Sequence, residues 1–325
     1  MLENFPHSKI ESPDVNSEAL EALAERLDLK KQYLAQVKVL YQSGILENFA
    51  PTPERPTPEM GIVGIDGQEY ILPDYEAILD RLKDPETREL IEKKVAQGFT
   101  KLQLTPFALP LSVLIDRYRQ TLLRIHKETG IKATNGSTLE LDENQPVYVW
   151  EKLTQSDNPN TSLDQQMEYG VTNYTGQTKE ARGGKSKIEL LQANPDHAWQ
   201  LSLIEDLPDL PAQNQGQTIA GRKSLEANQS PEDYLKLLQT QESYQGETGQ
   251  TPESALVTWL TYLQEKHTAI DDYQGQGKAN WLVGNYVSGY VPNFYWYRDY
   301  RLPDLYGLNS GIRYSHYGFR PMARF

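Results

Sequence analysis

The first 130 residues carry a mainly helical pattern of hydrophobic positions. Leu20, Leu23 and Leu27 repeat at the spacing expected for one face of a helix. At Asp84-Pro85, an aspartate that can cap a helix N-terminus is followed by a proline, which is favoured at the first helical position. Asp66-Gly67 instead predicts the turn of a hairpin. Together these signals predict helices over residues 17–27, 30–43, 74–82, 85–97 and 110–128, and a hairpin over 61–72.

The pattern changes after Gly130. Short runs rich in β-branched and aromatic residues predict strands, and a polar segment between them predicts long loops. We expect the strands at 138–141, 146–153 and 198–204, and the loops over 154–186. Residues after Asn280 read as short β-like runs broken by glycine and proline.

Two further helices begin with a hydroxyl residue followed by proline and acids, at Ser230-Pro231 and Thr251-Pro252. The hydroxyl oxygen satisfies a free backbone N–H, and the acids favour the positive end of the helix dipole. Leucine and tryptophan repeat in the second helix so that one face is expected in the core. The chain therefore predicts an α+β fold, with a mainly helical N-terminal module over 1–130 and a β-rich domain over 131–325.

Charge and composition narrow the classes of function. The net charge is −13 and the pI is near 5.0, which argues against nucleic acid as a partner because phosphate binding needs clustered Lys and Arg. The absence of cysteine removes disulfides, thiolate nucleophiles and Cys-ligated metals. The first 17 residues show no signal peptide, and no apolar run has membrane-spanning length. We expect a protein without membrane insertion, cytoplasmic by default.

No residue pattern marks out a catalytic, cofactor or metal site. None of the five histidines lies at metal-ligand spacing from another, and each is expected to be structural or exposed. Gly184-Lys185-Ser186 is similar to the end of a phosphate-binding loop, but position 179 is Lys179 where that motif needs glycine. Acid–base catalysis by paired carboxylates stays open, although aspartate is more common in turns and caps.

The last 44 residues have an unusual composition. Eight of the 20 tyrosines fall within 282–325, interleaved with Asn, Ser and Gly, and no Lys, Glu or Gln follows Trp281. Tyrosine with small polar residues is the composition of antibody-type binding surfaces. A buried sheet also favours tyrosine over Lys and Glu, but it would contain more Val, Ile and Leu, and it would not keep five arginines while losing every lysine.

The tail resembles the variable proteins of diversity-generating retroelements. The similarity lies in Trp281-Leu-Val-Gly-Asn-Tyr, in Gly289-Tyr-Val-Pro-Asn-Phe-Tyr-Trp-Tyr-Arg-Asp and in the ending Tyr317-Gly-Phe-Arg-Pro-Met-Ala-Arg. It covers about residues 140–325. The resemblance implies a C-type-lectin-like domain with short antiparallel strands and two helices, related to the formylglycine-generating enzymes, with a variable region over about 282–325. In that family, diversification of AAC-like codons cannot produce Lys, Glu, Gln, Met or Trp, so Trp296 and Met322 would be constant.

The resemblance implies two sets of positions. The ligand-facing variable set is Asn293, Phe294, Tyr295, Tyr297, Tyr300, Leu302, Pro303, Asp304, Tyr306, Asn309, Ser310, Tyr314, His316 and Tyr317. The scaffold set is Trp281, Gly284, Trp296, Arg298, Gly318 and Arg320, expected to pack the core, form tight turns and donate charge-assisted hydrogen bonds to backbone carbonyls.

Three functions follow from these observations. The first is a non-catalytic, receptor-like protein that binds a protein or other macromolecule, with no cofactor and no metal, and with homo-oligomerisation open. The second is an enzyme on the formylglycine-generating fold that lacks the cysteines of that chemistry. The third is a structural or viral assembly protein, whose tail would pack on a fixed partner and would not vary between related copies.

Overall fold

The computed structural model describes residues 15–153 and 166–325. It combines helices with mainly antiparallel sheets, so the α+β prediction is confirmed at that level. The helices are α1 (Val15–Arg26), α2 (Leu29–Gln42), α3 (Tyr75–Leu82), α4 (Pro85–Ala96), α5 (Leu111–Thr129), α7 (Lys179–Arg182), α8 (Lys187–Ala193), α9 (Pro231–Thr240) and α10 (Pro252–Lys266), with 3-10 turns at Glu151–Leu153, Pro195–Ala198 and Glu242–Tyr244.

Most strands are short, and β4, β16 and β17 are the longest of those described, with seven residues each. The strands are β1 (Glu47–Phe49), β2 (Glu59–Val63), β3 (Glu69–Ile71), β4 (Phe99–Thr105), β5 (Ile131–Lys132), β6 (Thr138–Leu139), β7 (Tyr148–Val149), β8 (Glu168–Tyr169), β9 (Gln200–Glu205), β10 (Thr218–Ile219), β11 (Arg222–Lys223), β12 (Glu247–Gly249), β13 (Asp272–Tyr273), β14 (Ala279–Trp281), β15 (Asn285–Tyr286), β16 (Val291–Tyr297), β17 (Leu302–Leu308), β18 (Tyr317–Phe319) and β19 (Pro321–Arg324).

The local signals predicted the helix starts well. Asp84 caps α4 by accepting from the backbone N–H of Thr87, and Ser230 and Thr251 form capping boxes before prolines. The Asp66-Gly67 turn joins β2 to β3 as predicted. Helix α7 lies inside the segment expected to be loop, where the Thr178 side chain caps it, so the loop prediction is wrong there. Helix α8 follows that segment and was not predicted; Ser186 caps it. Residues 154–165 of that expected loop lie outside the described residues.

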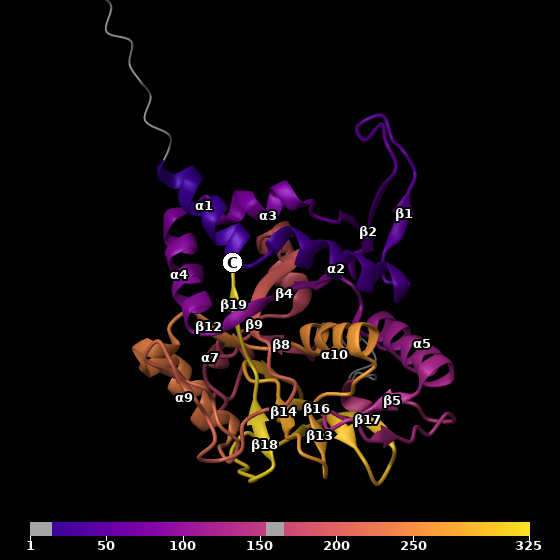
Figure 1. The fold of residues 1–325 in the computed structure, drawn as a ribbon, viewed down its shortest axis with the longest axis vertical. Coiled ribbons are helices and arrows are strands. Elements are labelled where there is room, and N and C mark those ends of the chain that lie inside the picture. Colours follow the sequence, from indigo (N-terminus) through magenta and orange to yellow (C-terminus); the bar gives the residue numbers. More distant parts are fainter. Residues whose placement is uncertain (1–14, 154–165) are drawn as a thin grey trace, which may run out of the picture.

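Helix α10 is buried more completely than its pattern predicted. Every residue from Pro252 to Leu263 is buried, whereas one buried face was expected. The reason is its position: α10 packs against α2 and α5 and also against strands β4 and β16. Figure 1 shows it between the helix-rich end of the molecule and the strands at the opposite end.

The predicted boundary near residue 130 crosses a continuous core. Strand β4, from the N-terminal side, pairs with β9, which pairs with the C-terminal strand β19 in the order β12-β19-β9-β4. A single hydrophobic cluster extends from Leu20 in α1 to Ala323 in β19. Within the described ranges, the first 130 residues are therefore part of the same packed body as the rest, and they contribute strands as well as helices.

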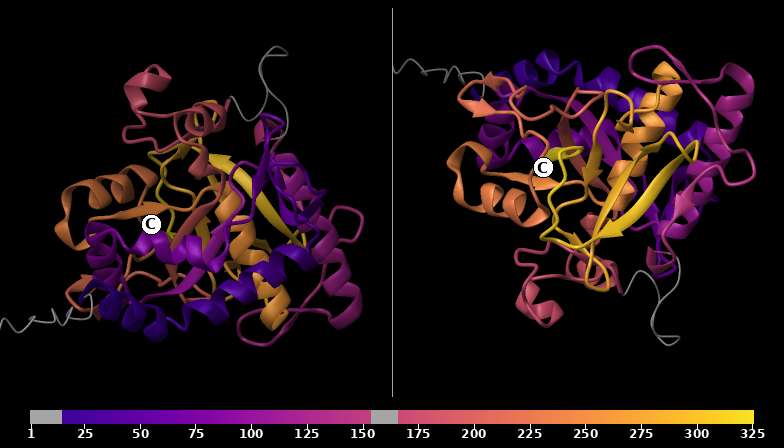
Figure 2. Two further views of the ribbon diagram at one scale, coloured as in Figure 1. Left: turned by 90° about the horizontal axis from the view of Figure 1, so that it is seen from above. Right: turned by 90° about the horizontal axis from the view of Figure 1, so that it is seen from below.

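A six-stranded sheet positions the tail. Its order is β18-β14-β16-β17-β7, with β13 also paired to β16. Strands β16 and β17 form an antiparallel hairpin with seven residue pairs, from Val291↔Leu308 to Tyr297↔Leu302. One face of this hairpin packs on α5 and α10, and the other face points away from these helices. The hairpin is drawn as the broad yellow strands in Figure 2.

Candidate functional site

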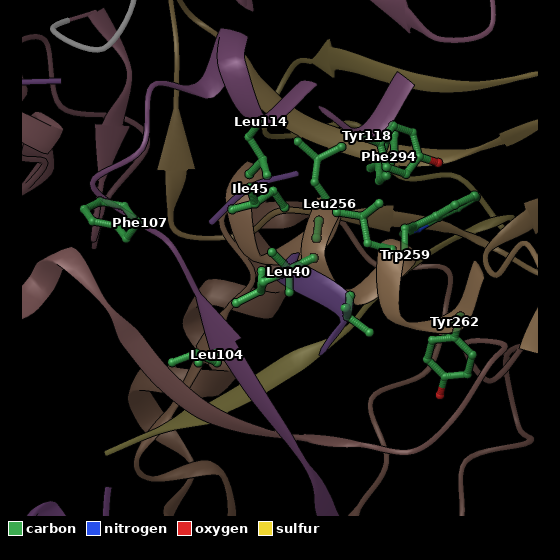
Figure 3. Packing of buried hydrophobic residues seen from close by; sticks show 14 of the residues in the cluster. Leu40, Ile45, Leu104, Phe107, Leu114, Tyr118, Leu256, Trp259, Tyr262 and Phe294 are labelled. Carbon is green, nitrogen blue, oxygen red and sulfur yellow. The ribbon is translucent and has the colours of Figure 1, made fainter. Parts of the chain in front are cut away.

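The alternation of β16 decides which predicted positions point outward. Side chains along a strand alternate between its two faces. Phe294 and Trp296 point inward and are fully buried, whereas Tyr295 and Tyr297 lie on the outer face. The Phe294 ring centroid lies 5.8 Å from that of Tyr118 in α5 and 4.9 Å from that of Trp259 in α10 (Figure 3).

The structure therefore corrects three of the predicted ligand-facing positions. Phe294 is a core residue, and Pro303, its neighbour on the inner face, is paired with Trp296 and buried. Asn293 shares the strand face of Tyr295, but it is completely covered and pairs in register with Trp281. In this fold none of these three side chains presents surface to a ligand.

The outer face forms a grid of side chains centred on Asp304. Across the sheet, Asp304 is paired with Tyr295 of β16 on one side and with Tyr148 of β7 on the other. Along β17 it is flanked two residues away by Leu302 and Tyr306, which share its face because strands repeat every two residues. Asp304 is thus surrounded by aromatic and apolar groups.

This grid opens into a pocket of about 520 Å³. The predicted positions that line it are Tyr295, Tyr297, Tyr300, Leu302, Asp304 and Tyr306. Sequence reasoning missed the remaining lining residues, Asp142, Gln145 and Tyr148. Tyr148 lies in a segment predicted as a Tyr- and Trp-rich strand, but its pairing with β17 is a long-range contact that the local pattern does not reveal.

Asp304 is the buried polar group of the pocket. Its side chain has 7 % exposure, and the Tyr295 hydroxyl donates a hydrogen bond to its Oδ2 atom over 3.1 Å. Its Oδ1 atom has no hydrogen-bond partner among the described residues. Burial raises the pKa of Asp304 to about 6, against the stabilising effect of the Tyr295 hydrogen bond. Burial, and secondarily the charge of Asp304, raises the pKa of Tyr295.

A second aromatic group continues the outer face beyond the pocket. Tyr314 stacks on His316, with ring centroids 5.3 Å apart and planes inclined by 18°. His316 contacts Tyr317, whose ring lies 5.9 Å from that of Tyr295. Tyr314 is exposed, His316 is partly buried and Tyr317 is mostly covered, so the three form a graded aromatic surface leading to the pocket.

Asn309 and Ser310 do not line the pocket. Asn309 is exposed, and its side chain accepts from the backbone N–H of Gly311 over 3.1 Å. Ser310 is nearly buried and donates to the Glu232 carboxylate over 2.7 Å, which ties the loop to α9. Asn309 keeps a surface position, whereas Ser310 has a structural contact.

The predicted scaffold residues occupy structural positions. Trp281 and Trp296 are fully buried, and Gly284 has φ +88°, in the region that favours glycine. A Cβ at Gly318 would approach Leu210 within 3.2 Å, so this position has little free space.

The two scaffold arginines have partners that differ in part from the expected backbone carbonyls. Arg298 donates to the Asp272 carboxylate, over 2.8 Å from Nε. Arg320 is completely buried and pairs with Asp271 over 2.8 Å while also donating to the carbonyl of Leu207. The carbonyl contact was expected for Arg320, and the carboxylates are additional to it.

Residues 15–153 and 166–325 contain no cluster of three or more His, Asp or Glu side chains arranged to hold a metal ion. Their helices include none that combines the length and apolar character needed to cross a membrane.

No protein-family model, no curated protein and no solved structure matches this chain.

Proposed function

We propose that this chain is a ligand-binding protein whose specificity lies in the outer face of the β16–β17 hairpin and the adjoining loop to Tyr317. The observation that carries the proposal is the pocket: Tyr295, Tyr297, Tyr300 and Tyr306, all predicted as ligand-facing, line it together, with Tyr295 buried, Tyr297 and Tyr306 partly covered and Tyr300 exposed. Tyrosine is enriched at binding hot spots because it supplies a large contact area with few rotatable bonds.

The support beneath the pocket fits such a role. The inner side of the same hairpin packs through Phe294, Trp296 and Leu305 onto the main core. On the outer side Tyr295 and Tyr317 belong to a second buried cluster, so the backbone is held without the more exposed rings of Tyr297, Tyr300 and Tyr306. A binding surface that varies between copies needs a frame of this kind. The sequence resemblance extends the proposal to a variable protein of a diversity-generating retroelement with a C-type-lectin-like domain.

The DNA around the gene tests this extension. A near-repeat of the coding sequence for about residues 282–325, differing at adenines and accompanied by a reverse transcriptase gene, is the expected result. Copies should differ at outer-face positions such as Tyr297, Tyr300 and Tyr306 and agree at Phe294 and Trp296. A tail that is invariant among related copies would contradict diversification and would favour an assembly protein.

The binding proposal has its own test at the protein level. A displayed library randomised at Tyr297, Tyr300, Tyr306, Tyr314 and His316 should yield folded clones that bind new protein targets. A matched library randomised at the buried inner positions should lose folded protein. Folded outer-face clones that never acquire a ligand would count against the binding role.

One observation favours an enzyme as the second candidate. A carboxylic acid with a raised pKa inside a pocket is a feature of general acid–base sites. Asp304 has this character, but its hydrogen-bond partner is Tyr295, whose own pKa is raised, so the pair supplies no activated nucleophile. Turnover of a small substrate that depends on Asp304 would establish the enzyme.

A further inference from the structure

The charged side chains that line the pocket described above are all negative. Its described lining residues include the carboxylates of Asp142 and Asp304 and contain no Lys, Arg or His. The nearby Arg301 does not line it; its guanidinium lies 3.5 Å from the Glu140 carboxylate. A negatively charged concavity with low-dielectric walls attracts cations.

Asp304 lines the pocket and carries one oxygen, Oδ1, that is unpartnered within the described ranges; this oxygen is covered and would meet a bound cation after a turn of the carboxylate. Oδ2 accepts from the Tyr295 hydroxyl, whereas Oδ1 is buried without a partner among the described residues. A buried, unpartnered carboxylate oxygen is costly, and a ligand that donates a charged hydrogen bond removes this cost. The pairing of Asp304 with Tyr295 and Tyr148 places aromatic rings on both sides of the carboxylate.

The surrounding rings favour the same ligand. The ring centroids of Tyr148 in β7 and Tyr306 in β17 lie 6.3 Å apart, and those of Tyr295 and Tyr297 in β16 lie 5.9 Å apart. Tyr300 packs edge-on against Tyr297 at 4.6 Å. Tyrosine rings attract cations through their electron-rich faces, and a cluster of them beside a carboxylate is suited to an ammonium group.

We propose that this pocket binds the alkylammonium group of a lysine side chain on a protein partner. The inference deepens the proposed binding function and rests on it. Ammonium is preferred over guanidinium because Asp304 has one free oxygen, whereas guanidinium gains most from a carboxylate that offers two. The volume of about 520 Å³ is within the usual range for small-ligand sites, so it admits a whole lysine side chain.

The test uses the full chain and three end-blocked peptides, acetyl-Gly-X-Gly-amide with X as lysine, norleucine or arginine. Calorimetry or NMR titration at pH 7 should show the lysine peptide binding about tenfold or more tightly than the norleucine peptide, the size expected for one charge-assisted hydrogen bond. Equal binding of lysine and norleucine peptides, or tighter binding of the arginine peptide, would overturn the proposal.

Matched variants locate the site. Asp304→Asn should weaken the lysine peptide about tenfold or more, whereas Asp299→Asn, which removes an exposed carboxylate of the same tail outside the pocket lining, should leave the affinity within about twofold. Tyr148→Phe should retain binding and Tyr148→Leu should lose about threefold or more, because only the ring supplies the cation–π attraction. Loss of binding in Asp299→Asn alone would place the site elsewhere.

Two further measurements are needed. One distinguishes a lysine side chain from a free amine, and the other distinguishes failure of the ammonium inference from failure of the proposed function. Binding of n-butylammonium as tightly as the lysine peptide would assign the site to free amines and overturn the protein-side-chain part. If the lysine peptide fails to bind while selected outer-face library clones bind protein targets, the ammonium inference falls and the proposed function stands. If the tail proves invariant between copies, diversification falls while the peptide result is unaffected.

Discussion

Tyr295 and Asp304 face each other across the β16–β17 hairpin, and the tyrosine hydroxyl donates to the carboxylate over 3.1 Å inside the aromatic pocket. The contact satisfies one carboxylate oxygen and leaves the other without a partner in the described parts of the chain. This carboxylate is buried next to apolar rings, where a charge is costly. The stability of the fold therefore depends on whether Asp304 is protonated.

The first prediction concerns this link. Burial raises the pKa of Asp304 from an ordinary value of 3.8 to about 6, so the folded protein holds this proton more tightly than the unfolded chain. The resulting stability is fully present below about pH 4 and is lost as the pH rises through about 6. Asp304→Asn removes this titration, so its free energy of unfolding relative to the parent should increase between pH 4 and pH 8.

The expected increase is about 3 kcal/mol at most, because the pKa rises from 3.8 to about 6 and each tenfold change in proton affinity corresponds to about 1.4 kcal/mol. Urea denaturation of both proteins across the pH range measures it, with Asp299→Asn as the exposed control. A difference between Asp304→Asn and the parent that stays constant from pH 4 to pH 8 would contradict the buried, raised carboxylate.

The second prediction separates the two faces of the hairpin. Phe294→Ala should lower the free energy of unfolding by about 3–5 kcal/mol, because the ring fills the space between α5 and α10. Tyr300→Ala, at a side chain that is 62 % exposed, should change it by about 1 kcal/mol or less. Chemical denaturation compares them, and similar losses at the two positions would show that the assignment of inner and outer faces is wrong.

The third prediction concerns the buried pair of Arg320 and Asp271. Arg320→Leu leaves the fully buried Asp271 carboxylate without its partner, which should cost about 3–5 kcal/mol at neutral pH. Adding Asp271→Asn should recover part of this loss because it removes the unpaired charge. Thermal or denaturant unfolding of both variants tests this, and a double variant that is no more stable than Arg320→Leu would show that the pair is not coupled.

Gly284 provides the fourth prediction. Its φ of +88° lies where a side chain is strained, although an added Cβ would meet nothing within 4 Å. Gly284→Ala should therefore destabilise the fold by about 1–2 kcal/mol through backbone strain alone. Gly311→Ala, at an exposed loop glycine without a positive φ, is the matched control for denaturation measurements. Equal stability of Gly284→Ala and the parent protein would show that the fold does not require glycine at this position.

Local chemistry was sufficient for many elements. Capping residues such as Asp84, Ser230 and Thr251 marked helix starts because the hydrogen bonds of a helix end are satisfied by neighbours in sequence. The Asp66-Gly67 turn was visible for the same reason. The tyrosine-rich composition of the tail predicted a binding surface, and that role stays a prediction.

Tertiary packing decided which of those residues form the site. In β16 both strand faces carry aromatic side chains, so alternation alone could not distinguish Phe294 and Trp296 from Tyr295 and Tyr297; the packing of α5 and α10 on one face made that choice. Tyr148 joined the pocket through parallel pairing with a strand more than 150 positions later. The sequence by itself determined the helix starts and the chemistry of the tail, because these depend on neighbouring residues. The inward and outward faces, the charged pocket floor and the core that crosses residue 130 depend on contacts between distant segments, and only the tertiary structure decided them.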